Sequence, residues 1–142
     1  MGIPILIIRF PYNTQIMKEK FTIEFGLKKG STKALWKLIS TPHGLAEWMA
    51  DNVDEDNTGI YTFSWKKSSE RAKLLEIQPE ERIRFRWMNA PEDTYFEIEI
   101  IKSELTGEIS LLLTDFAASD EKEDLINLWA SEIDMLIRRI GL

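Results

Sequence analysis

The stretch that decides the fold is STPHGLAEWMADNV, residues 40–53. It brings a proline, the only histidine of the chain, a glycine and a tryptophan together just ahead of a run of acids. A helix before Pro42 must end near Ser40, because the residue preceding a proline is pushed away from helical dihedral angles. Thr41 can then cap a second helix that has Pro42 at its first position, where the missing N–H is no loss. The stretch therefore predicts a helix, a kink and a second short helix.

Both predicted helices carry apolar residues at helical spacing. Ser31 can cap the first helix, whose apolar residues are Leu35, Trp36, Leu38 and Ile39. The second helix places Leu45, Trp48 and Met49 on one face, so the ring of Trp48 is predicted to point inward. Ahead of both helices, residues 20–28 alternate between polar and apolar side chains, which indicates a half-buried strand.

Strand-like segments continue after the acids. Five of them, separated by turn signals, cover residues 59–65, 71–77, 82–87, 95–101 and 109–116. The third alternates almost without fault, with Ile83, Phe85 and Trp87 on one side and three arginines on the other. Such alternation predicts an antiparallel meander with one face in solvent. Thr106 and Gly107 supply the hairpin turn before the last strand.

A long helix is predicted at the end of the chain, from about residue 120 to residue 140. Asp120 and Glu123 have the spacing of a capping box, and Arg138 and Arg139 suit a helix C-terminus. The apolar arc of this helix is broad and comprises Leu125, Leu128, Trp129, Ile133, Leu136, Ile137 and Ile140. A helix with so wide an apolar face must lie against the predicted sheet.

The order of these elements predicts one domain over residues 17–142, made of a strand, two short helices, further strands and a long helix. Residues 1–16 are interpreted as an N-terminal extension, either an added strand or a tail. Their apolar run, residues 3–8, is far shorter than the ~20 residues needed to cross a bilayer. It also lacks the positively charged segment that begins a signal peptide.

Composition restricts the function. The 142 residues contain no cysteine, which excludes disulfides, thiolate nucleophiles and cysteine metal sites and fits a reducing, cytoplasmic location. The formal net charge of −6 repels nucleic-acid phosphates and anionic membranes, so we expect neither nucleic-acid binding nor membrane insertion. We expect no cofactor.

The acids of residues 51–57 invite comparison with a calcium-binding loop. Asp54, Asp56 and Gly59 fit the first, third and sixth positions of an EF-hand. Trp65 stands at the twelfth position, where a bidentate glutamate is needed. We therefore interpret the segment as a solvated surface loop without a metal.

A basic stripe is predicted on the strand at residues 82–87. Its members are Arg82, Arg84 and Arg86, and the sequence places Glu97 and Glu99 on the strand expected next to it. Opposite charges paired across strands stabilise a solvated sheet face by about 0.2–1 kcal/mol a pair. The same face is a candidate surface for a protein partner.

Five tryptophans, one acid and one histidine are the candidate functional residues. Trp36, Trp48, Trp65, Trp87 and Trp129 either line an apolar ligand pocket, with indole N–H groups as polar handles, or form ordinary core. Glu132 falls inside the apolar arc of the long helix, where it either meets a cation, faces a wet cavity or lies at a solvated edge. Any histidine-based catalysis must use His43, whose place in the first turn of a short helix is more typical of an exposed residue.

Taken together, the sequence resembles the START-like, helix-grip superfamily, also called SRPBCC or birch-pollen-allergen-like, and within it the homologues of the heat-shock ATPase activator. The resemblance is carried by STKALWKLISTPHGLAEWMADNV (31–53), GIYTFSW (59–65), RAKLLEIQPEERIRFRW (71–87) and LLLTDFA (111–117), with Trp129 in the last helix. It implies an α+β fold in which a curved antiparallel sheet of about six or seven strands wraps around the C-terminal helix. The two short helices would close one end, with a cavity between helix and sheet.

Members of that superfamily carry hydrophobic molecules, a few are cyclases or hydrolases, and the heat-shock activators bind a chaperone, so the fold alone does not choose a function. We expect a non-enzymatic domain that binds a small apolar or amphipathic molecule, lipid-like or aromatic. The predicted ligand-binding residues are Trp48, Trp65, Phe85, Trp87, Trp129 and, as polar handle, Glu132. The alternative is a protein-interaction module of the co-chaperone type that uses the outer sheet face and the acidic loop. A third interpretation, a small cyclase or hydrolase, requires His43 or Glu132 inside the cavity.

Overall fold

The computed structural model describes residues 17–27 and 30–140. Within them, seven strands form one antiparallel sheet in the spatial order β2-β8-β7-β6-β5-β4-β3. The strands are β2 (Glu19–Gly26), β3 (Asn52–Glu55), β4 (Ile60–Trp65), β5 (Ser68–Gln78), β6 (Arg82–Trp87), β7 (Phe96–Lys102) and β8 (Ile109–Ala117), and the helices are α1 (Thr32–Ser40), α2 (Pro42–Leu45) and α3 (Lys122–Arg139). The predicted fold class is confirmed. The predicted extension, residues 1–16, lies outside the described residues.

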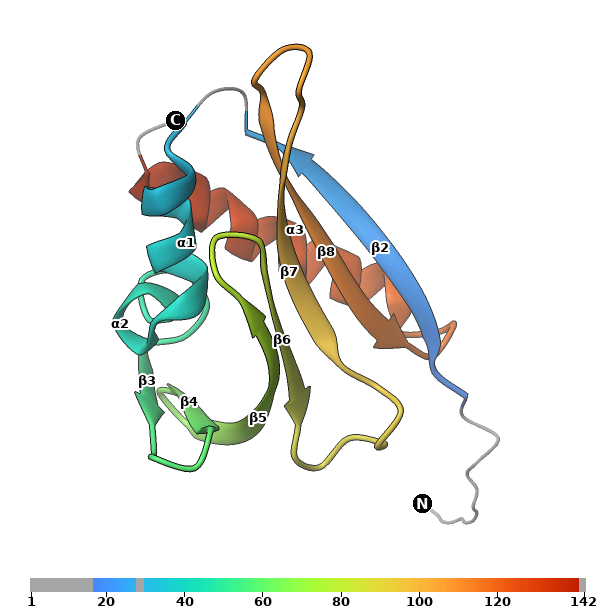
Figure 1. Cartoon of the computed structure of the whole chain (residues 1–142). Coiled ribbons are helices and arrows are strands. Elements are labelled where there is room, and N and C mark those ends of the chain that lie inside the picture. The colour runs from blue at the N-terminus through green and yellow to red at the C-terminus, as the bar shows by residue number, and fades with distance from the viewer. Residues whose placement is uncertain (1–16, 28–29, 141–142) are drawn as a thin grey trace, which may run out of the picture.

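The sheet curves, and α3 crosses its concave face while α1 and α2 stand at one end (Figure 1). Strands alternate as predicted, so that Phe85, Phe96 and Leu113 point to the concave side and are fully buried. Ile133 and Leu136 of α3 are buried against them. Burying a side chain of this size contributes about 1.5–3 kcal/mol, so this layer between helix and sheet is the main stabilising feature of the fold.

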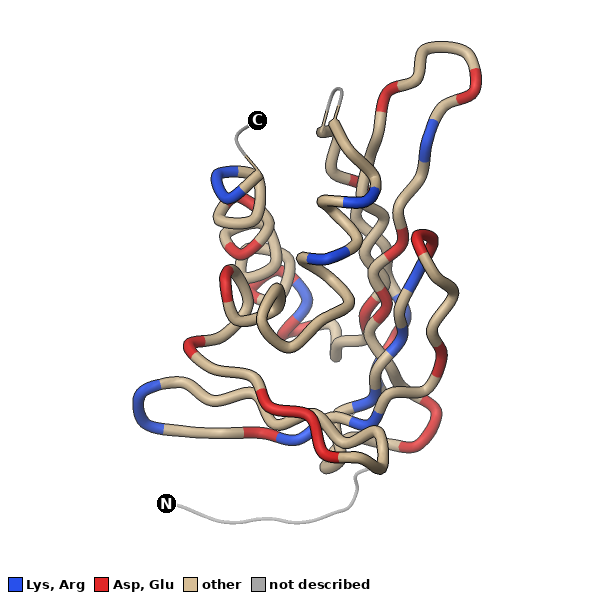
Figure 2. Tube along the Cα trace, turned by 60° about the vertical axis from the view of Figure 1, so that its left-hand side comes forward, with Lys and Arg blue, Asp and Glu red and all other residues tan. Residues whose placement is uncertain are grey.

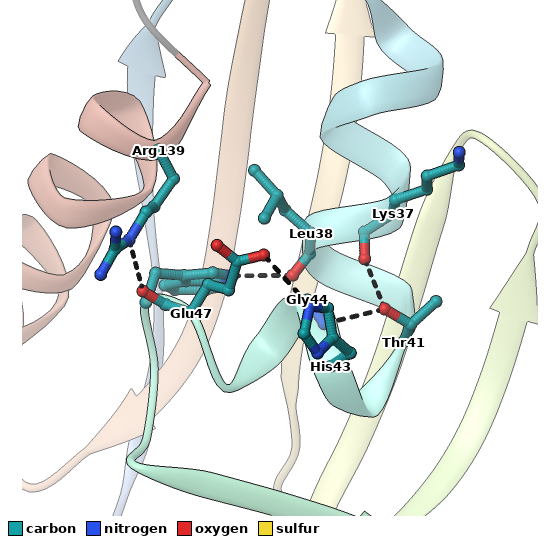
Figure 3. Close-up of polar contacts among 8 residues, drawn as sticks. Lys37, Leu38, Thr41, His43, Gly44, Glu47 and Arg139 are labelled. Carbon is teal, nitrogen blue, oxygen red and sulfur yellow. Dashed lines mark hydrogen bonds and ion pairs between the residues drawn. The ribbon is translucent and has the colours of Figure 1, made fainter.

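The corner between α1 and α2 explains the composition of residues 40–53. The last carbonyls of a helix have no N–H partner within it, and here two of them are satisfied by side chains. Lys37 O accepts from Thr41 Oγ1 at 2.7 Å, and Leu38 O accepts from Trp48 Nε1 at 2.7 Å. Thr41 Oγ1 in turn accepts from the N–H of Gly44 at 2.9 Å, which confirms the predicted N-cap (Figure 3).

The acidic segment is not a loop throughout, and that part of the prediction was wrong. Asn52–Glu55 forms the edge strand β3, because Val53 buries its side chain opposite Phe63 of β4. Only the turn that follows matches a surface loop. There Asp56 Oδ1 accepts from Thr58, whose hydroxyl is the largest cause that lowers the pKa of Asp56. The described residues hold no group of acids or histidine arranged to bind a metal ion.

The capping box predicted for α3 was also wrong. The N-cap of α3 is Glu121, which makes no side-chain capping hydrogen bond. The chain enters the helix through a turn in which Glu121 N donates to Ala118 O at 2.9 Å. Glu123 and Asp124 lie in the first turn, where their charges complement the positive end of the helix dipole. No helix in the described part of the chain is long and apolar enough to cross a membrane.

The pairing predicted for the basic stripe is confirmed on the outer face of the sheet. Arg84 lies opposite Glu97, and its Nε donates to Glu97 Oε1 at 2.7 Å. Arg82 lies opposite Glu99 but donates instead to Glu76 Oε2 of β5 at 2.9 Å. Charges of both signs are spread along the strands (Figure 2), so this face suits solvent.

Candidate functional site

The candidate site is a cavity of about 420 Å³ where the start of α3 approaches the end of β8. We call it the α3–β8 cavity. Its walls include the apolar groups of Trp87, Ala90, Leu125 and Leu128, and its charged groups are Lys18, Asp115, Glu121 and Asp124. Elements far apart in sequence therefore contribute both apolar and charged groups to one space.

Asp115 is the most buried charged group of the α3–β8 cavity, with 8% of its surface exposed. It shares the concave side of β8 with Leu113, two residues before it. Its Oδ2 accepts from Trp129 Nε1 at 2.8 Å, and its Oδ1 accepts from the N–H of Phe116 at 2.7 Å. Burial raises the pKa of Asp115, while these hydrogen bonds and the charge of Lys18 lower it in part. The carboxylate is thus desolvated and held by neutral donors.

Glu132 lies one turn beyond Leu128 on α3 and is half-buried. Burial, and to a smaller extent the negative charge of Asp115, together raise the pKa of Glu132 to about 8. Glu132 forms no ion pair with the described residues, so the cation that was one of its predicted alternatives is absent from them. Glu132 does not line the α3–β8 cavity, but it is close enough to Asp115 for the two charges to interact.

Aromatic rings connect the α3–β8 cavity to the core. The ring centroid of Phe96 lies 5.0 Å from that of Trp87, 5.2 Å from that of Phe85 and 5.8 Å from that of Trp129. Three of the predicted ligand-binding residues therefore meet around Phe96. Phe85 is fully buried and Trp129 is nearly so, which leaves Trp87 as the predicted residue that lines the cavity directly.

The structure places Trp48 and Trp65 elsewhere. Trp48 Nε1 donates to Leu38 O, and Trp65 Nε1 donates to Met49 O at 3.2 Å. Both indoles thereby stabilise the segment around α2, and neither lines the α3–β8 cavity. Their role as ligand walls stays a prediction.

A second groove, of about 570 Å³, lies between the α1–α2 corner and the end of α3. His43 lines this groove with a side chain that is 92% exposed, and its Nε2 lies 3.7 Å from Glu47 Oε2. Arg139 Nε donates to the carbonyl of Glu47 at 3.2 Å and joins α3 to the corner (Figure 3). His43 therefore lies outside the α3–β8 cavity.

Sequence reasoning missed Asp115 and Lys18 as residues of the cavity. The sequence did contain a signal for Asp115. In LLLTDFA the alternation of side chains places Asp115 on the inward face of the strand, where the other residues are apolar. Lys18 directly precedes β2. Lys18 reaches the cavity only because β2 pairs with β8, and these two strands are far apart in the sequence.

With this geometry in place, the chain can be compared with known proteins. The profile of the START-like superfamily domain matches residues 15–142. The chain belongs to the START-like superfamily. The predicted resemblance to the START-like superfamily is thus confirmed. No curated protein matches the sequence.

Solved structures of the same fold include proteins of diverse description. A Bacteroides fragilis protein solved by solution NMR is 38% identical, with 88% of this chain and 93% of that chain covered and a TM-score of 0.59. The Aha1 dimer of Colwellia psychrerythraea is 16% identical, with 87% and 97% covered and a TM-score of 0.73. DynU16, from the dynemicin biosynthetic locus, is 12% identical, with 84% and 46% covered and a TM-score of 0.69. At such low identity the last two show a common fold alone.

Proposed function

We propose that this START-like domain binds a small apolar or amphipathic molecule in the α3–β8 cavity. The supporting observation is a space of about 420 Å³ with apolar walls next to a desolvated carboxylate. Ligand pockets typically measure about 300–1,000 Å³ and combine mainly apolar walls with a few placed polar groups. Trp87, Leu125 and Leu128 would contact the apolar part of the ligand, and Asp115 would hold its polar end.

The first test is the intact mass of the natively purified protein beside its denatured mass, with an organic extract analysed in parallel. We expect a bound mass that is lost on denaturation. Ala90→Phe should abolish it, because Ala90 lines the cavity and the larger side chain fills part of the space. Ala130→Phe, on the exposed side of α3, is the matched control and should keep the bound mass. Equal native and denatured masses, or a bound mass that survives Ala90→Phe, would contradict the proposal.

A second candidate function is a protein-interaction module, favoured by a basic patch on the outer sheet face. This β5–β6 patch consists of Arg71, Lys73 and Arg86, and Lys73 lies directly opposite Arg86. None of the three forms an ion pair within residues 17–27 and 30–140. Like charges opposite each other destabilise a sheet, so the patch suits an acidic partner that would compensate them.

Charge reversal distinguishes this second candidate from ligand binding. Arg84→Glu is a poor test because Arg84 is paired with Glu97 and its loss would disturb the sheet. Arg86→Glu is expected to reduce capture of a protein partner at least tenfold in a pull-down. The control is Lys33→Glu, at an exposed position of α1, which should leave capture unchanged. Equal capture by both variants would exclude the β5–β6 patch as the docking surface.

A further inference from the structure

The charges of the α3–β8 cavity indicate which class of ligand it takes, an inference that rests on the proposed function. We propose that the ligand is a cationic amphiphile: a protonated amine that pairs with the carboxylate of Asp115, joined to an aromatic or short aliphatic body. Four features of the described residues support this assignment.

The first feature is the balance of charge. The cavity is lined by the three carboxylates of Asp115, Glu121 and Asp124 and by one ammonium group, that of Lys18, a formal net charge of −2. A cleft whose charges are mainly of one sign concentrates ligands of the opposite sign, because its low-dielectric walls focus the field.

The second feature is the unused capacity of Asp115. A carboxylate offers about four lone-pair sites, and Asp115 receives two neutral N–H donors, from Trp129 and from the backbone of Phe116. It has no ion pair among the described residues although it is more than nine-tenths buried. A buried charge without a counter-charge is costly, and a ligand ammonium group at the remaining sites would offset that cost.

The third feature is the aromatic and aliphatic wall. The ring of Trp87 is half-buried between Phe63 and Phe96, at 5.3 and 5.0 Å between centroids, and Trp87 also lines the cavity. Indole faces attract cations more strongly than other aromatic side chains do. Leu125 and Leu128 complete the wall, and Leu128 keeps 53% of its surface exposed, which a ligand body would cover.

The fourth feature concerns the groups that would favour an anion. The N-terminus of a helix attracts anions, and α3 begins beside the cavity. Glu123 and Asp124 in its first turn already supply negative charge there. Lys18 is exposed and makes no ion pair with Asp115, so solvent and salt screen its charge. The cavity therefore favours a cation over an anion of the same shape.

The test uses three probes of one shape: phenylbutylamine, phenylbutanol and phenylbutyrate, titrated into the full chain. The reporter is the indole N–H signal of Trp129 in ¹H–¹⁵N spectra, which is sensitive to Asp115 because the two groups share a hydrogen bond. A Trp129→Phe variant assigns that signal. We expect the amine to bind about tenfold more tightly than the alcohol, the ratio expected for one charge-assisted over one neutral hydrogen bond, and the acid to bind most weakly.

Two variants localise the effect. Asp115→Asn should remove most of the preference for the amine over the alcohol, with the Trp87 signal as reporter. Lys18→Gln should strengthen amine binding several-fold, and it keeps the test valid if Asp115→Asn does not fold. Lys20→Gln is its control, since Lys20 is exposed on β2 and does not line the cavity.

The outcomes separate this inference from the proposed function. Equal affinities of amine and alcohol, or a preference for the acid, would overturn the cationic ligand and leave a binding cavity in place. If none of the probes moves the signals of Trp129 or Trp87, ligand binding in the α3–β8 cavity is contradicted as well.

Discussion

Replacing Gly44 with alanine is expected to lower the free energy of unfolding by about 3 kcal/mol, the upper end of the usual cost of overpacking. A Cβ on Gly44 would overlap the carbonyl oxygen of Lys37 and would lie 2.7 Å from Cα of Leu38. These are backbone atoms at the end of α1, so no rotamer change can move them away. The carbonyl of Lys37 accepts the hydrogen bond of Thr41 and that of the neighbouring Leu38 accepts the hydrogen bond of Trp48, and a displaced α2 would weaken both.

The sign of this effect is informative, because alanine normally stabilises a helix relative to glycine by about 1 kcal/mol. Gly26→Ala is the matched control: a Cβ there meets nothing within 4 Å. We expect the control to be neutral or slightly stabilising, and Gly44→Ala to lower the melting temperature by roughly 10 °C. Thermal unfolding followed by circular dichroism measures both. Equal melting temperatures for the two variants would show that α2 shifts without cost.

The α1–α2 corner shows what the sequence could predict. Pro42 and Thr41 carry local rules, one on the residue before a proline and one on helix capping, and both positions behave as those rules require. The indole of Trp48 was expected to point inward, and it does. Its hydrogen bond to Leu38 O could not be foreseen, since it depends on how the kink orients the last carbonyls of α1.

The strands likewise could be predicted where the local pattern is strong and not where they depend on a neighbouring strand. Alternation predicted β6, where Phe85 and its inward neighbours contrast with arginines. It could not predict β3, because Val53 is the one apolar residue in Asn52–Glu55 and the strand exists only through pairing with β4. Edge strands of this kind are rich in charge and short. Their existence is decided by the neighbouring strand.

For the candidate site, the sequence predicted inward-facing aromatic residues but overlooked Asp115 and Lys18. Trp87 and Trp129 both lie near the α3–β8 cavity, as expected from inward phases on a strand and a helix. Asp115 was overlooked although the alternation of β8 places it on the inward side, because no local pattern shows that a cavity adjoins this end of the strand. The proximity of Asp115 to Glu132 arises from packing of α3 on β8, which no local pattern encodes.

Replacing Glu132 with glutamine is expected to stabilise the protein at pH 8.5 by about 2–4 kcal/mol, allowing for partial exposure of the side chain. The pKa of Glu132 rises from 4.5 to about 8 on folding, through burial first and the charge of Asp115 second. Below pH 4.5 the group is protonated in both states and has no effect on stability. As the pH rises from 4.5 towards 8, the unfolded chain ionises while the folded chain resists, so stability is lost across this range.

Urea unfolding at pH 5 and pH 8.5 measures this loss in the native protein, in Glu132→Gln and in the control Glu104→Gln, whose residue is exposed in the β7–β8 turn. The free energy of unfolding of Glu132→Gln should be close to that of the native protein at pH 5 and higher than it at pH 8.5. The free energy of unfolding of Glu104→Gln should match that of the native protein at both pH values. Asp115, whose pKa is also raised by burial, remains in all three proteins, so part of the pH dependence persists. If the free energies of unfolding of the native protein and of Glu132→Gln change with pH in the same way, Glu132 is solvated when ionised. The third alternative from the sequence, a wet edge of the apolar arc, would then hold.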